Sequence, residues 1–150
     1  MAELKRILLA EDNPKDVELT LEALSENNLA NEVIVVRDGA EALDYLCRRG
    51  KFQMRAGNNP AVVLLDIKMS KVDGIEVLRI IKSDEHLKTI PVVILTSSRE
   101  EQDLVRSYQL GVNAYVVKPV NFDDFFRAIK KLGVFWALIN EPPVGSIGKK

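Results

Sequence analysis

The sequence predicts an α/β domain built on a doubly wound, five-stranded parallel sheet with five helices. Two observations carry this prediction. Short apolar runs alternate five times with longer amphipathic stretches, and the runs show no apolar–polar alternation along their length. Strands of that kind are buried on both faces, as in parallel sheets that lie between two layers of helices. The length of 150 residues suits one such domain.

Each element has its own signal. The apolar runs predict strands over 7–10, 33–36, 61–66, 91–96 and 114–117. The stretches between them predict helices over 14–27, 39–48, 74–82, 99–110 and 121–140. In the last helix the apolar spacing predicts a core stripe of Phe122, Phe125, Ile129, Leu132 and Trp136. We expect 1–140 to form the domain and 141–150, with two prolines and two glycines, to be a flexible tail without an output domain.

Composition excludes several classes of protein. Lys plus Arg is 21 and Asp plus Glu is 22, so the net charge of −1 gives no basic excess for general nucleic-acid binding. With Cys47 as the one cysteine, no intrachain disulfide can form, which fits a reducing compartment. The sequence shows no secretory signal and no apolar run long enough to cross a membrane. We therefore expect a cytoplasmic protein.

The residues that follow the strands are the candidates for function. A doubly wound sheet carries its site beyond the carboxyl ends of its strands. Those positions hold Glu11 and Asp12 after the first strand, Asp66 at the end of the third, Thr96 at the end of the fourth and Lys118 after the fifth. Neither GxGxxG nor GxxxxGK[ST] occurs, so a glycine-rich phosphate loop is not supported.

These residue types together favour phosphoryl transfer. If the first and third strands are neighbours, three carboxylates converge and repel one another unless a cation binds between them. An all-oxygen site suits Mg²⁺ or Mn²⁺. Asp66 at the strand tip then predicts a nucleophile that becomes an aspartyl phosphate. Lys118 offsets charge on the phosphoryl oxygens, and Thr96 can donate a hydrogen bond to one of them.

The sequence resembles the receiver domains of two-component response regulators. The matching stretches are LLAEDNP (8–14), VVLLDIKMSKVDG (62–74), PVVILTSS (91–98) and GVNAYVVKP (111–119). The resemblance implies a flavodoxin-like sheet of strand order 2-1-3-4-5. It implies that Asp66 is the phosphoacceptor, that Asp12 is a direct metal ligand and that Glu11 acts from the outer shell. It also implies that the backbone carbonyl of Lys68 is a metal ligand.

The same resemblance assigns switch residues. It implies that Thr96 is the switch hydroxyl, that Tyr115 is the switch aromatic and that Lys118 precedes a cis peptide bond to Pro119. Ser70 stands where most receivers have proline, and this departure is expected to loosen the loop after Asp66 without removing a chemical group.

A finer resemblance concerns the partner. The long loop at 48–60, SYQLGVNAY (107–115) and FWALI (135–139) are similar to the small response regulators that partner bacterial and cyanobacterial phytochromes. This resemblance implies a light-regulated histidine kinase as phosphodonor. We also expect a homodimer through the face of the fourth helix, fifth strand and fifth helix, where Tyr108, Tyr115, Phe126 and Phe135 supply apolar area.

Two other functions compete with a phosphorylation-controlled binding switch, which is not an enzyme in its own right. The first is an aspartate-nucleophile phosphatase of haloacid dehalogenase type, which requires a second aspartate where this chain has Lys68. The second is a pseudo-receiver scaffold, against which the intact acid trio and Lys118 argue. His86 lies in a polar connection far from the strand ends, so the chain is a poor candidate for the phosphohistidine carrier.

Overall fold

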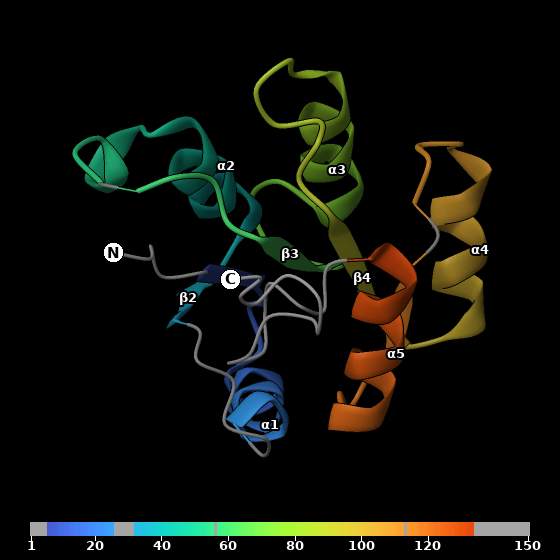
Figure 1. Ribbon diagram of the computed structural model, residues 1–150. Coiled ribbons are helices and arrows are strands. Elements are labelled where there is room, and N and C mark those ends of the chain that lie inside the picture. The colour runs from blue at the N-terminus through green and yellow to red at the C-terminus, as the bar shows by residue number, and fades with distance from the viewer. Residues whose placement is uncertain (1–5, 26–31, 56, 113, 134–150) are drawn as a thin grey trace, which may run out of the picture.

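Five short parallel strands form the sheet in the computed structural model, which describes residues 6–25, 32–55, 57–112 and 114–133 (Figure 1). The strands are β1 (Arg6–Ala10), β2 (Glu32–Val36), β3 (Val62–Asp66), β4 (Val92–Thr96) and β5 (Tyr115–Val117). Their order across the sheet is β2-β1-β3-β4-β5, and every paired strand is parallel to its neighbour. The predicted flavodoxin-like topology is confirmed.

Helices follow each strand along the described chain. They are α1 (Pro14–Ser25), α2 (Gly39–Cys47), α3 (Gly74–Ser83), α4 (Arg99–Ser107) and α5 (Phe122–Leu132), and a 3-10 turn, η1 (Gly50–Phe52), lies in the loop before β3. The side chains of Asp38, Asp73, Ser98 and Asn121 each accept a hydrogen bond from the backbone N–H three residues later. These N-caps explain where four of the helices begin.

Alternate strand residues build two cores. Leu8 and Leu65 belong to the core beneath α2, α3 and α4. Leu9 and Leu64 belong to the core beneath α1 and α5, on the other face of the sheet (Figure 1). Because both faces are covered, the strands need apolar residues along their middle positions, as their sequences show.

Two helices end earlier than the sequence predicts. Helix α4 ends at Ser107, because Gln109 has a φ of 54° and leaves the helical conformation. Helix α5 ends at Leu132, because Gly133 takes a left-handed conformation with a φ of 76° and its N–H caps the last carbonyls. Phe125 and Ile129 of the predicted core stripe are buried, and Phe122 and Leu132 are partly buried. Trp136, Phe135 and the predicted tail lie outside the described residues.

Among the described residues, no helix has the length and apolar character needed to cross a bilayer.

Candidate functional site

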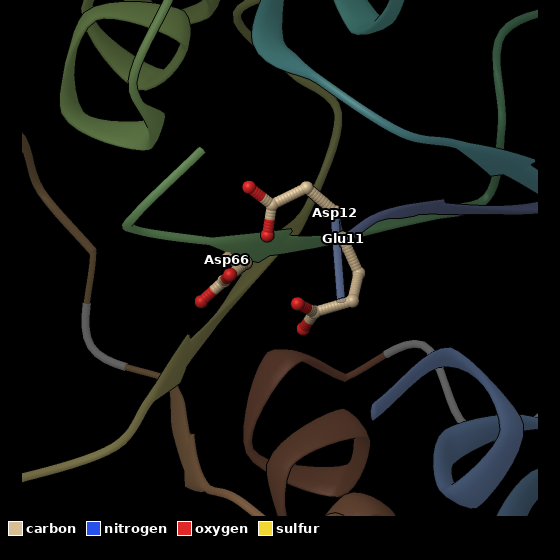
Figure 2. Close-up of side chains that lie close together, drawn as sticks. All are labelled: Glu11, Asp12 and Asp66. Carbon is tan, nitrogen blue, oxygen red and sulfur yellow. The ribbon is translucent and has the colours of Figure 1, made fainter. Parts of the chain in front are cut away.

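Three carboxylates meet at the carboxyl ends of β1 and β3. One oxygen from each of Glu11, Asp12 and Asp66 lies within 4.8 Å of the others. In Figure 2, Asp12 and Glu11 project to opposite sides of the end of β1, and Asp66 stands at the end of β3. Glu11 is 0% exposed and Asp66 is 3% exposed. The structure therefore brings together all three acids that the strand ends predicted.

The register of the sheet explains this convergence. Ala10 of β1 pairs with Leu65 of β3, so the next residues, Glu11 and Asp66, leave the sheet at the same level. Gly74, the first residue of α3, packs directly against this edge, and a Cβ there would lie 2.1 Å from the carbonyl oxygen of Asp66. Only glycine permits such a close approach, so this position fixes the start of α3 against the backbone of Asp66.

Lys118 joins the acids from β5. Its Nζ lies 3.2 Å from Glu11 Oε1, 3.2 Å from Asp66 Oδ1 and 3.1 Å from Asp16 Oδ2. The peptide bond between Lys118 and Pro119 is cis, as the resemblance implies. Sequence reasoning missed Asp16, because an acid in the first turn of a helix is expected to interact with the helix dipole. The start of α1 directly after Asp12 was the signal that could have placed it at the site.

Burial and mutual repulsion shape the titration of the acids. Burial and the nearby charge of Asp66 raise the pKa of Glu11 from 4.5 to about 7, although Lys118 opposes the rise. Burial also raises the pKa of Asp66, with Lys118 again acting in the opposite direction. Burial alone would lower the pKa of Lys118, but Asp66, Asp16 and Glu11 raise it well above its usual value. Lys118 therefore stays protonated at neutral pH, whereas Glu11 and Asp66 both lose their protons less readily than an exposed carboxyl.

This group of atoms suits a hard divalent cation. The ligands are oxygens, the donor type preferred by Mg²⁺ and Mn²⁺. Burial raises the pKa values of Glu11 and Asp66, and a cation bound beside them would favour their ionised forms. Asp12 is the accessible member of the group, whereas Glu11 is buried behind it and bonded to Lys118. The direct-ligand role of Asp12 and the outer-shell role of Glu11 stay predictions.

Thr96 and Tyr115 lie on the neighbouring strands β4 and β5. Thr96 is 0% exposed, and its Oγ1 is buried without a hydrogen-bond partner. Buried hydroxyls usually have a partner, so this one is available to a group bound at the site. Tyr115 is half-buried, its hydroxyl donates to the carbonyl of Val112 at 3.3 Å, and the Arg106 guanidinium lies 4.9 Å from its ring centroid.

The loop between β3 and α3 carries Lys68 and Ser70. The Lys68 side chain is 81% exposed, and its Nζ lies 3.5 Å from Oε2 of Glu101 on α4, a contact that sequence reasoning missed. The Ser70 carbonyl accepts hydrogen bonds from the N–H groups of Gly39 at 3.3 Å and Val72 at 2.8 Å. The loop is thus tied to the start of α2 although serine replaces the usual proline.

The face formed by α4, β5 and α5 differs in one respect from expectation. A groove of about 310 Å³ runs between α4 and α5, and α5 lines it with Asp124, Arg127, Ala128 and Lys131. Phe126 instead packs against the core under α1 and α5 and stacks on Phe122 at 5.5 Å. Because successive helical residues point about 100° apart, Phe126 cannot share a face with Asp124. The prediction that Phe126 adds apolar area to this face is therefore wrong.

Comparison with known families identifies the class of protein to which this fold and site belong. The response regulator receiver domain matches residues 7–130, so the chain belongs to the response regulator receiver family. It is therefore a signalling domain and not an enzyme in the usual sense.

Individual relatives narrow the class. The chain is 40% identical over 132 residues to response regulator Rcp1 of Synechocystis sp., covering 88% of each chain. It is 67% identical to the solved bacteriophytochrome response regulator AtBRR, with a TM-score of 0.89 and coverage of 93% of this chain and 100% of that one. A structure of the phosphorylated cyanobacterial phytochrome response regulator RcpA matches at 43% identity and a TM-score of 0.72, covering 89% of this chain and 94% of that one. The chain is thus related to phytochrome response regulators, and these likenesses give no support to the phosphatase or the scaffold.

Proposed function

We propose that this receiver domain accepts a phosphoryl group from a histidine kinase on Asp66, with Mg²⁺ or Mn²⁺ bound beside it. The observation that carries the proposal is the position of Lys118, whose Nζ lies 3.2 Å from the buried acceptor Asp66 while Glu11 and Asp12 complete a cation site. A structure of response regulator Rcp1, 38% identical to this chain, is described as its Mn²⁺-bound form, and that of RcpA as phosphorylated.

The chain's own residues support this transfer. An Asp66 oxygen forms a bond to phosphorus as the phosphorus–nitrogen bond of the donor phosphohistidine breaks, and the electron pair leaves with the imidazole nitrogen. Lys118 stabilises charge on the transferred oxygens, and the unpartnered Thr96 hydroxyl can donate to one of them. Asp12, Asp66 and the Lys68 carbonyl would hold the cation, with Glu11 behind them, and the bound cation would offset charge on the phosphoryl oxygens.

Labelling with acetyl phosphate tests the acceptor. Wild type with Mg²⁺ should gain one phosphoryl group, and Asp66→Asn should gain none, because an amide is a poor nucleophile. Asp103→Asn, which removes a carboxylate from the exposed side of α4, is the matched control and should be labelled like wild type. Labelling of Asp66→Asn at the wild-type rate would show that the acceptor lies elsewhere.

A metal titration tests the ligand roles. Asp12→Ala should weaken Mg²⁺ binding more than Glu11→Ala, because the first variant loses a direct ligand and the second an outer-shell group. Equal losses would contradict these roles.

A phytochrome-type light sensor is the proposed histidine kinase, because the relatives AtBRR and RcpA are described as phytochrome response regulators. Phosphotransfer from such a kinase should be much faster than from an unrelated histidine kinase. Equal phosphotransfer rates from the two kinases would contradict the proposal of a phytochrome-type donor. A cytoplasmic location follows from such a donor and is part of the same proposal.

The phosphoryl group on Asp66 is proposed to change partner binding at the face of α4, β5 and α5, acting through Thr96 and Tyr115. The same face is the proposed homodimer surface. Val117, which is 51% exposed, and Tyr115 supply its apolar area. The expectation that Tyr108 adds to this face is not met, because the Arg79 guanidinium of α3 lies 5.6 Å from the Tyr108 ring centroid. Val117→Asp should favour monomer in sedimentation, whereas Phe126→Asp should not act through this face. The division into a domain at 1–140 and a tail at 141–150 is also a proposal, which limited proteolysis tests.

A further inference from the structure

Helix α4 is held to the sheet by little apolar burial. Its buried residues are Glu101 and Val105, and one of these is a carboxylate. By contrast, α2 and α3 each bury five residues, and α5 buries Phe125, Ala128 and Ile129. An open pocket of about 530 Å³, lined by the loop between β3 and α3, by Asp12 and by Leu104 of α4, further limits the packing of α4. The polar contacts of Glu101 therefore matter more for the position of α4 than such contacts usually do.

Glu101 connects three segments. Its Oε1 accepts a hydrogen bond from Ser97 N–H at 2.8 Å, one residue before the N-cap Ser98. Its own N–H donates to Ser98 Oγ at 3.2 Å, so Glu101 takes part in two bonds that hold the start of α4. Its Oε2 lies 3.5 Å from Lys68 Nζ in the loop between β3 and α3. Burial raises the pKa of this carboxyl, but hydrogen bonds from Ser97 and the charge of Lys68 outweigh burial and lower it. Glu101 is thus an ionised, 8% exposed anion beside the acceptor site.

Both partners of this anion lie next to the acceptor. Lys68 is the second residue after Asp66, and Ser97 directly follows Thr96. A phosphoryl group on Asp66 adds about −1.5 to −2 charge and three strong acceptor oxygens. It repels the Glu101 carboxylate and competes with it for the same N–H and ammonium donors.

We propose that Glu101 is a positioning residue that holds α4 to the loop between β3 and α3 in the unphosphorylated protein, and that a phosphoryl group on Asp66 displaces it from Ser97 and Lys68. This inference rests on the proposed function. After displacement, α4 keeps Val105 as its buried apolar contact and loses the hydrogen bond from Ser97 to Glu101. The phosphate thereby acts on α4 by a route separate from Thr96 and Tyr115.

Glu101→Gln and Glu100→Gln form a matched pair for the test. Both remove one negative charge from the first turn of α4, but only the first removes a charge that pairs with Lys68. The glutamine side-chain oxygen can still accept the hydrogen bond from Ser97 N–H, so the variant should fold. The first measurement is amide hydrogen exchange in α4 of the full chain without ligand. The second is the affinity for beryllofluoride, a phosphoryl mimic, in the presence of Mg²⁺.

We expect Glu101→Gln to exchange its α4 amides about twofold to fivefold faster than Glu100→Gln and to bind beryllofluoride about twofold to fivefold more tightly, the range for an ion pair with one exposed partner. Beryllofluoride should also accelerate α4 exchange in wild type. Indistinguishable exchange in the two variants would overturn the holding role, and unchanged wild-type exchange on saturation would overturn the displacement. If wild type does not bind beryllofluoride, the proposed function fails and the displacement with it, while exchange in the ligand-free variants still decides the holding role.

Discussion

Glu11→Gln should stabilise the metal-free protein, and the gain should grow with pH. Glu11 is fully buried, and its pKa is about 7 in the folded protein against 4.5 as the ordinary value. Between these values the folded state binds the proton more tightly than the unfolded chain, so raising the pH costs the wild type stability. Glutamine cannot ionise and avoids this cost.

The size of the effect follows from the two pKa values. At about 1.36 kcal/mol per pKa unit, the raised pKa of Glu11 lowers the free energy of unfolding by roughly 1 kcal/mol at pH 5 and roughly 3 kcal/mol at pH 8, relative to acid pH where Glu11 is protonated in both states. The difference between Glu11→Gln and wild type should therefore increase by about 2 kcal/mol over this range. Any effect of glutamine on the free energy of unfolding that is the same at every pH cancels when the differences at pH 5 and pH 8 are compared.

Urea unfolding in the presence of a chelator measures this difference at each pH. Glu22→Gln, an exposed change on α1, is the control and should show no such slope. Saturating Mg²⁺ should reduce the advantage at pH 8, because a ligand at 100 times its Kd stabilises the folded wild type by about 2.7 kcal/mol. A difference that stays constant or shrinks between pH 5 and pH 8 would refute the reasoning.

Four further outcomes are expected. Mg²⁺ affinity should fall as the pH is lowered from 8 to 6 in calorimetric titrations, because a proton on Glu11, whose pKa is about 7, opposes the cation. Lys118→Met should lower the free energy of unfolding by about 3 kcal/mol or more at pH 8, since it leaves buried carboxylates unpaired, and Mg²⁺ should restore part of the loss in thermal melts. Thr96→Val should raise the free energy of unfolding by about 1 kcal/mol in urea titrations, because it removes a buried hydroxyl without a partner, yet it should weaken the response to beryllofluoride. Gly74→Ala should sharply reduce the yield of folded protein in circular dichroism, because its Cβ would lie 2.1 Å from the Asp66 carbonyl oxygen.

The sequence by itself determined the sheet and the residues at its edge. Five apolar runs without alternation indicate a parallel sheet, and such a sheet places the ends of all its strands at one edge. Asp66 and Thr96 could therefore be found as the last residues of their runs, and Asp12 and Lys118 one or two residues after theirs. The local sequence pattern was enough to find these residues, because the shared direction of the strands alone brings their carboxyl ends together.

Only the tertiary structure decided how the helices meet that edge. Helix phase changes by about 100° per residue, so small differences in packing decide which side chain faces a groove. For this reason Phe126 turned toward the core under α1 and α5, away from the predicted dimer face. Asp16 reached Lys118, more than 100 residues away in sequence, and Glu101 reached Lys68, because α1 and α4 begin at the rim of the site. Such contacts depend on where two elements dock, which no local pattern records.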